Sequence, residues 1–178
     1  WTLTALPLFV WMGEILFRTK LSENLFEGLS PWMQKLPGGL IHVNVVGCAI
    51  FAAISGSSAA TVATVGKMSI PELRKRNYPE KILLGSLAGS GTLGLLIPPS
   101  IILIIYGVTV QESIAKLFIA GIFPGIMIAI IFMTYVVIWS LMNKNKMPVL
   151  TEEIPFIEKI KKSGKLIPVI LLIVSVIG

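Results

Sequence analysis

The sequence predicts an all-α integral membrane protein with a re-entrant helical hairpin and a helix broken by proline. Its composition indicates the membrane: 54% of the residues are hydrophobic and 13% are charged, whereas soluble domains average roughly 25% charged residues. The mean hydropathy is +0.86. Two uncharged stretches, 36–66 and 82–111, each carry helix-breaking residues near the midpoint. Unpaired backbone groups are costly in hydrocarbon unless they face protein or water, so these breaks predict a polar site inside the membrane.

The charged residues predict how the chain crosses the membrane. Long uncharged gaps lie between Lys35 and Lys67, Lys81 and Glu112, and Lys116 and Lys144, and each exceeds the ~20 residues that a span needs. Basic residues gather around 18–35, 67–81 and 144–165, whereas the connection around 108–116 is poor in them. The positive-inside rule therefore places the three basic regions in the cytoplasm and the fourth connection outside.

The stretch 36–66 is the predicted hairpin. As one straight helix it would be about 46 Å long, well beyond the ~30 Å hydrocarbon core. Basic residues on both flanks require it to enter and return, and the run Ser55-Gly56-Ser57-Ser58 at its centre can turn tightly. We expect Pro37–Ile54 to enter and Ala59–Met68 to return. One long tilted span with a glycine kink is the alternative.

The remaining elements follow in chain order. Residues 1–17 are expected to descend to the cytoplasm, and Ser30-Pro31 splits 22–36 into two short interfacial helices. Ile70-Pro71 and Asn77-Tyr78-Pro79 mark a cytoplasmic turn. The predicted segments are 1–36, descending and interfacial helices; 37–69, hairpin; 70–110, broken helix; 111–142, uninterrupted span and probable scaffold; 143–165, cytoplasmic loop; and 166–178, the next span. Both ends fall within hydrophobic segments, which predicts a piece of a larger protein.

The two breaks are the candidate binding site, because paired discontinuous helices commonly hold an ion and an anionic substrate. Pro98 and Pro99 remove two backbone donors after a glycine-rich approach. Hydroxyls and unwound carbonyls suit a hard cation, and the absence of an acid in either broken segment favours Na⁺ over H⁺. The candidate Na⁺ ligands are Ser55, Gly56, Ser57, Ser58, Gly91, Thr92, Gly94 and Pro98. The candidate substrate contacts are Asn44, Ser57, Ser58, Ala59, Pro99 and Ser100.

Other chemistries fit the sequence poorly. Gly89-Ser90-Gly91-Thr92-Leu93-Gly94 matches a dinucleotide fingerprint, but it lies in a predicted span with no acidic residue before Glu112. The serines at the hairpin tip have no nearby base, so we expect no enzyme and no catalytic residue. A single Cys and a single His leave no set of ligands for a transition metal. The net charge of +6 belongs to short loops, so no nucleic acid is expected as a partner.

Four blocks of this chain resemble the large membrane subunit of TRAP transporters. They are Ala5-Leu6-Pro7-Leu8-Phe9, the hairpin from His42-Val43-Asn44 to Ser57-Ser58-Ala59, Gly94-Leu95-Leu96-Ile97-Pro98-Pro99-Ser100, and Leu117-Phe118-Ile119-Ala120-Gly121-Ile122-Phe123-Pro124-Gly125. Their order and spacing cover nearly the whole chain. The resemblance implies Na⁺-driven, elevator-type uptake of organic anions, such as C4-dicarboxylates or sialic acid, across a bacterial inner membrane. It also implies a small four-helix membrane subunit, a periplasmic substrate-binding protein and contact with membrane lipid, and no organic cofactor.

Two departures from the family pattern matter. Many members have an acidic residue just after the hairpin Ser-Gly-Ser, where this chain has Ala59-Ala60-Thr61. The family's second, inverted repeat is also absent from these residues, so part of the substrate site is expected to lie outside them. Two alternatives remain: another hairpin-containing Na⁺/anion symporter, and a membrane assembly subunit that does not transport. The substrate cannot be identified from these residues.

Overall fold

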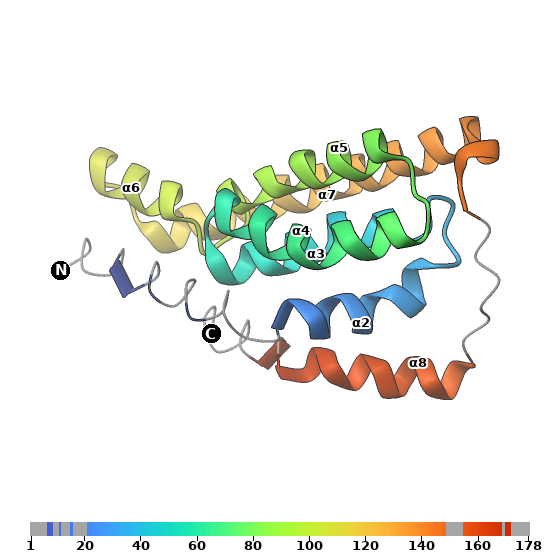
Figure 1. The fold of residues 1–178 in the computed structure, drawn as a ribbon. Helices are drawn as coiled ribbons and strands as arrows, with labels where there is room; N and C mark the ends of the chain where they lie inside the picture. Colours follow the sequence, from blue (N-terminus) through green and yellow to red (C-terminus); the bar gives the residue numbers. More distant parts are fainter. Residues whose placement is uncertain are drawn as a thin grey trace.

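The computed structural model describes residues 21–148 and 155–168, together with positions 7, 8, 11, 15, 170 and 171. Every regular element within these residues is helical (Figure 1). The elements are α2 Leu21–Met33, α3 Ile41–Ser55, α4 Ser58–Lys75, α5 Glu80–Gly91, η2 Thr92–Leu95, α6 Ile101–Val110, α7 Ile114–Met142, η3 Lys144–Lys146, α8 Phe156–Ser163 and η4 Gly164–Leu166. The first predicted helix, 1–17, and most of the final ascent from 166 lie outside the described residues.

Helices α3 and α4 pack against each other as a helical hairpin (Figure 1). The turn between them depends on two residues. Gly56 ends α3 in the left-handed region, with φ of +60°, and its N–H donates to Ala52 O. Ser57 is extended and caps α4, because its side chain accepts from Ala60 N. Glycine adopts positive φ without strain and serine is a favoured N-cap, so this short sequence is enough to reverse the chain.

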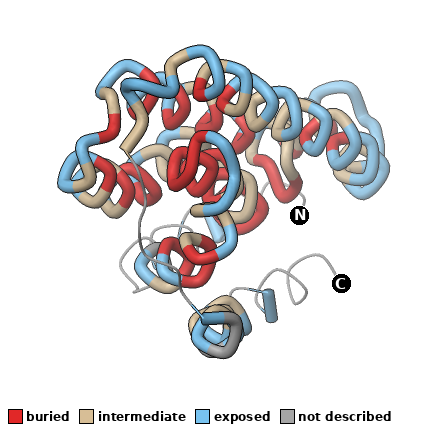
Figure 2. The backbone as a smooth tube through the Cα atoms, turned by 90° about the vertical axis from the view of Figure 1, so that its right-hand side faces the viewer, coloured by how far each residue is buried: buried red, intermediate tan, exposed pale blue. Residues whose placement is uncertain are grey.

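Helix α3 is the centre of the molecule. It contacts α2, α4, α5, η2 and α7, and the buried residues in Figure 2 gather where these helices meet. One apolar cluster lies near the start of the hairpin and includes Leu40, Leu73 and Leu83. A second lies nearer the tip and includes Phe51, Ile54 and Leu87. Together they hold the hairpin and α5 as one packed body.

The helix of 82–107 breaks earlier than expected. The sequence placed the break at Pro98-Pro99, but α5 already ends at Gly91. A single 3₁₀ turn, η2, follows, and α6 begins only after Ser100. The Pro98-Pro99 peptide bond is cis. The glycine-rich approach lets the α-helix end before the prolines, because Gly91 and Gly94 are poor helix formers.

Helix α7 is the one described helix that is long and apolar enough to cross a membrane, with a mean hydropathy of 2.4 over its best window. It is continuous through Pro124, as the sequence predicted for an uninterrupted span. The apolar helices α3 and α6 are shorter. Gly121 and Gly125 of α7 face the broken segment: a Cβ at Gly121 would lie 2.7 Å from Leu96 O, and one at Gly125 would lie 2.8 Å from Ile97 Cγ1.

Two local predictions were wrong. Segment 22–36 holds one helix, α2, that continues through Pro31, and the Ser30 hydroxyl donates back to Phe26 O instead of capping a second helix. Helix α4 continues through Pro71 to Lys75, so the turn lies at Asn77-Tyr78-Pro79 alone, where Asn77 has φ of +59°. A proline removes a single backbone bond, and the packing of the buried Leu29 and Leu73 beside these positions maintains the helices.

The expected loop 143–165 also contains structure, because α8 lies beside α2 (Figure 1). Trp32 Nε1 donates to Ser163 Oγ at 2.8 Å, and Lys165 Nζ pairs with Glu27. The predicted interfacial position of 22–36 stays a prediction.

Candidate functional site

The hairpin tip meets the broken segment through the backbone. Ile101 N, at the start of α6, donates to Gly56 O at 3.2 Å. A Cβ at Gly56 would lie 2.5 Å from Pro99 O, which is shorter than any normal van der Waals contact. Position 56 therefore needs glycine both for its positive φ and for this close approach. The two breaks that the sequence predicted at similar depth are in direct contact.

Two further glycines bring the 3₁₀ segment against the start of α4. A Cβ at Gly94 would lie 2.8 Å from Ser58 N and 2.9 Å from Ser57 C. A Cβ at Gly91 would lie 1.9 Å from Val62 Cγ2. At Gly94 the backbone of one break thus lies directly on the backbone of the other, whereas Gly91 lies against the Val62 side chain.

Hydroxyl and carbonyl oxygens cluster at this contact. Ser55 Oγ and Thr61 Oγ1 are 2.9 Å apart, and either can be the donor. Thr61 Oγ1 also lies 2.8 Å from Ser57 O, and Ser55 Oγ lies 3.3 Å from the same carbonyl. Ser55 and Thr61 are buried. Three neutral oxygens therefore gather within the protein at the point where the hairpin turns.

The Ser58 hydroxyl is the one unsatisfied group at the tip. Its Oγ is buried and has no hydrogen-bond partner among the described residues. A buried hydroxyl without a partner is costly, so this group at the hairpin tip indicates a place for a ligand. No three His, Cys, Asp or Glu side chains in the described part of the chain are grouped to hold a metal ion. The donors available here suit a hard cation or an anion that accepts hydrogen bonds.

The structure brings together most, but not all, of the predicted site residues. The contact joins four hairpin residues, Ser55, Gly56, Ser57 and Ser58, to four residues of the broken segment, Gly91, Gly94, Pro99 and Ser100. The Ser100 hydroxyl donates to Leu95 O at 2.8 Å. Pro98 packs against α7 near Gly121, and Ala59 is exposed on the first turn of α4. Thr92 is exposed, and its hydroxyl donates to Gly89 O in its own helix. Thr92 can contribute to the site through its backbone alone in this conformation.

Asn44 lies away from the hairpin tip. It is in the first turn of α3, while Ser55 ends that helix, which is about 16 Å along the helix axis. Its Nδ2 donates to Ser86 Oγ at 3.0 Å and to Leu83 O at 3.2 Å. Ser90 Oγ bonds to Asn44 O from the next turn of α5. Asn44 therefore joins the hairpin to α5 and does not line the tip.

Thr61 is the site residue that sequence reasoning missed. It follows Ser57 by one helical turn, so its hydroxyl can reach back to the Ser57 carbonyl. The signal was its i+4 spacing from the capping serine. Its position inside α4, rather than in the turn, concealed it.

Comparison with known proteins decides the family. Residues 1–178 match the family model described as the tripartite ATP-independent periplasmic transporter, DctM component. The chain belongs to this family of TRAP transporter permeases. It is 35% identical over 178 residues to the C4-dicarboxylate TRAP transporter large permease protein DctM of Pseudomonas aeruginosa, covering 100% of this chain and 41% of that relative.

Two other relatives are named for different compounds. The ectoine/5-hydroxyectoine TRAP transporter large permease protein of Ruegeria pomeroyi is 36% identical over 80% of this chain and 33% of its own length. The sialic acid TRAP transporter permease protein of Haemophilus influenzae is 37% identical over 74% of this chain and 21% of its own length. The chain thus spans less than half the length of these curated relatives.

Family membership establishes the broad class of the protein. The DctM family consists of integral membrane permeases, so the chain belongs to a transporter family and not to an enzyme family. This confirms the resemblance drawn from the hairpin and the Pro-Pro break. It also removes the alternative of an unrelated hairpin-containing symporter.

Proposed function

We propose that this chain forms one half of the ion and substrate site of a Na⁺-driven importer of organic anions. One observation supports this most strongly: the hairpin tip, with the acid-free oxygens of Ser55, Ser57 and Thr61 and the unpartnered Ser58 hydroxyl, contacts the backbone of the broken segment. Na⁺ needs several oxygen ligands and no titratable group. The proposed ligands are the oxygens of Ser55, Ser57, Ser58 and Thr61, with backbone carbonyls of the 91–98 segment.

The proposed substrate is a small carboxylate, and its position follows from α4. This 18-residue helix begins at Ser58 with no acidic residue in its first turn. The N-terminus of a helix carries unpaired N–H groups and partial positive charge, which attract anions. A carboxylate at Ser57, Ser58 and Ala59, flanked by Pro99 and Ser100, would lie beside the proposed ion. The names of the relatives include C4-dicarboxylates, ectoine and sialic acid, all carboxylates, so the substrate class is proposed but not the compound.

The proposed mechanism divides the chain into a moving and a static part. The hairpin, 37–69, enters from the cytoplasm and returns, and it moves with α5 as one body across the membrane. Helix α7 stays with the scaffold. The apolar cluster nearer the tip, where Phe51 and Ile54 of the hairpin pack with Leu87 of α5, includes no residue of α7 and supports this division. The assembly is proposed to lie in a bacterial inner membrane with a small membrane subunit and a periplasmic substrate-binding protein.

Uptake by the full-length protein at varied Na⁺ concentrations tests the ion site. Ser58→Ala and Thr61→Val each remove one proposed ligand. Each should raise the Na⁺ concentration for half-maximal uptake by about fivefold, the equivalent of roughly 1 kcal/mol. Thr134→Val is the matched control, because Thr134 is exposed on α7 and its hydroxyl bonds to Ile130 O of its own helix. Unchanged Na⁺ dependence in both site variants, at normal expression, would place the ion elsewhere.

A labelling experiment tests the re-entrant path. Single cysteines at positions 35 and 74, in a background without Cys48, lie at the two outer ends of the hairpin. Both should react with a membrane-impermeant thiol reagent from the cytoplasmic side alone. If one of them is labelled from the periplasm, the stretch crosses the membrane once and the hairpin is not re-entrant.

A further inference from the structure

A pocket lies between α2, α4 and α8, on the opposite side of α4 from the broken segment. Its volume is about 540 Å³, within the range of about 300–1,000 Å³ that small-molecule sites occupy. Three basic and two acidic side chains line it, from three separate helical segments. The lining residues are Phe26, Glu27, Ser30, Pro31, Gln34, Lys67, Met68, Pro71, Glu72, Arg76 and Lys162.

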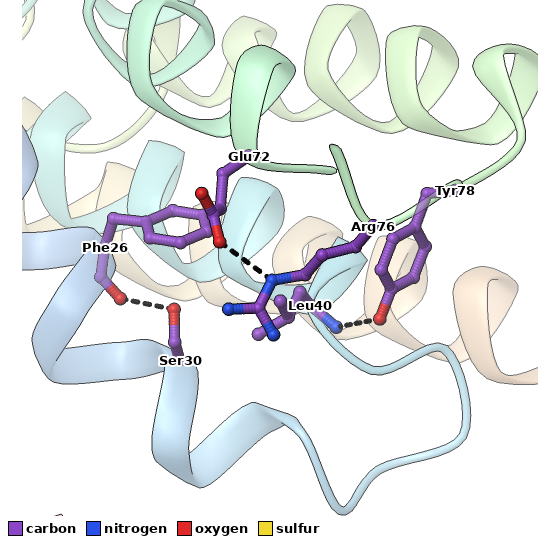
Figure 3. A network of polar contacts seen from close by, with 6 residues as sticks. All are labelled: Phe26, Ser30, Leu40, Glu72, Arg76 and Tyr78. Carbon is purple, nitrogen blue, oxygen red and sulfur yellow. Dashed lines mark hydrogen bonds and ion pairs between the residues drawn. The ribbon is translucent and has the colours of Figure 1, made fainter. Parts of the chain in front are cut away.

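The acidic side chains of this pocket are already paired. Glu72 Oε1 accepts from Arg76 Nε at 2.8 Å, Glu27 pairs with Lys165, and Lys162 Nζ lies 3.0 Å from Glu158 Oε1. The terminal nitrogens of Arg76 have no hydrogen-bond partner among the described residues. Figure 3 shows this guanidinium extending from the end of α4 toward the space that Phe26, Ser30 and Glu72 border. The pocket therefore still offers hydrogen-bond donors to an anion.

One side of the pocket is apolar and the other is basic. Phe26, Met68 and Pro71 supply the apolar wall, whereas Lys67, Arg76 and Lys162 supply the positive charge. A free phosphate would leave the apolar wall in water. A ligand with a phosphodiester and a hydrocarbon tail matches both surfaces, and basic pockets between helices on the cytoplasmic side of membrane proteins suit lipid headgroups. The pocket also lies toward the hairpin's basic end, which the positive-inside rule places at the cytoplasmic surface.

We infer that this pocket binds the headgroup of an anionic phospholipid, with the phosphate held by Arg76, Lys67 and Lys162. The lipid would connect α4 of the hairpin to α2 and α8 at the cytoplasmic surface. Arg76 is the main contact, because a guanidinium can donate two parallel hydrogen bonds to one phosphate. The acyl chains would cover Phe26 and Met68.

Native mass spectrometry of the full-length protein in detergent tests this site, with phosphatidylglycerol, diacylglycerol and inorganic phosphate as the added probes. Phosphatidylglycerol should bind, and the double variant Arg76→Gln/Lys162→Gln should weaken its affinity by about tenfold or more, as expected for lost charge-assisted hydrogen bonds. Lys75→Gln is the matched control, because Lys75 is exposed at the end of the same helix and does not line the pocket. The affinity of the Lys75→Gln variant for phosphatidylglycerol should equal that of the unmodified protein.

Three results would overturn the inference. Equal binding of diacylglycerol and phosphatidylglycerol would mean that the phosphate is not recognised. Inorganic phosphate must not displace the lipid, because displacement would identify a soluble phosphate site. Unchanged lipid affinity in the double variant would place the lipid elsewhere. If the double variant fails to fold, Lys162→Gln alone gives the same test, because it leaves the Arg76–Glu72 pair intact.

Discussion

Helices α3 and α7 are both strongly apolar, yet they occupy opposite environments. α3 buries twelve of its fifteen residues, and even His42 and Asn44 are fully enclosed. α7 buries only Gly121, Gly125, Val136 and Ser140 along its 29 residues. Hydropathy therefore does not distinguish a helix surrounded by protein from one that presents its side chains outward. The small residues of α3, such as Gly47 and Cys48, are buried where helices approach, whereas the exposed face of α7 carries Ile119, Phe123 and Met127.

This contrast separates two kinds of surface with different requirements. The hairpin and α5 meet through packed apolar side chains, a glycine and hydroxyls, so a small change there alters a close contact. The outward face of α7, with Phe123 at 77% and Ile119 at 71% exposed, makes few contacts within the described residues. Such a surface suits lipid or another protein subunit. Paired changes in the two regions can test whether they also differ in motion during transport and in tolerance of substitutions.

Crosslinks should give the largest difference. Gly66 of the hairpin faces Leu87 of α5, and Gly89 of α5 faces Phe132 of α7. Cysteine pairs at 66/87 and at 89/132, in a background without Cys48, can each be joined by a short bifunctional reagent. The first crosslink lies within the proposed moving body and should leave uptake intact, whereas the second ties that body to α7 and should abolish uptake. Arrest by the first crosslink alone would show that the hairpin and α5 move separately.

Glycine substitutions should give the next largest effect. Gly94→Ala places a Cβ 2.8 Å from Ser58 N, a backbone atom that cannot move aside without shifting the hairpin tip. We expect a loss of about 2–4 kcal/mol in the free energy of unfolding and little remaining uptake. Gly85→Ala is the control, because nothing lies within 4 Å of its Cβ position and alanine is the better helix former.

Melting temperature and uptake of the full-length protein measure this pair. Tolerance of Gly94→Ala would mean that the hairpin and the broken segment are less closely packed than the structure shows. Damage from Gly85→Ala would mean that this exposed glycine contacts a part of the assembly beyond the described residues.

The contrast also explains what the sequence could predict. The hairpin turn was recoverable because Gly56 and Ser57 have strong local preferences, and the uninterrupted span was recoverable from its length. Helix α8 was missed because its interactions with α2, such as Trp32 with Ser163, are distant in sequence. The early end of α5 at Gly91 was missed because the predicted break rested on the prolines and not on the glycines before them. Thr61 was missed because it lies inside α4, although its i+4 spacing from Ser57 is local.

Truncating an isoleucine in each region should give a smaller difference. Ile54 is fully buried beside the hairpin tip, whereas Ile126 of α7 is 54% exposed. Ile54→Ala should lower the free energy of unfolding by about 2–4 kcal/mol, because it leaves a cavity in packed protein. Ile126→Ala leaves no cavity and should change it by less than about 0.5 kcal/mol. Chemical unfolding in detergent measures both, and equal losses would indicate that α7 is also enclosed at this position.

The smallest expected effect comes from removing one hydroxyl at the base of the hairpin and, as its control, one on the exposed helix α6. Tyr78 is buried at the base of the hairpin, where its hydroxyl accepts a hydrogen bond from Leu40 N at 3.0 Å. Burial raises the pKa of Tyr78 above its ordinary value, so the hydroxyl stays neutral near pH 7. Tyr78→Phe leaves the Leu40 N–H without this partner and should cost about 1–2 kcal/mol of stability.

Tyr106→Phe makes the same chemical change on α6, where the side chain is 54% exposed. It should leave the melting temperature unchanged, since no hydrogen bond of this hydroxyl is present among the described residues. A drop in melting temperature for Tyr78→Phe alone would show that the hairpin is fixed at its base as well as at its tip. Equal behaviour of the two variants would mean that the Tyr78–Leu40 bond contributes nothing, and that the two apolar clusters alone hold the hairpin against α5.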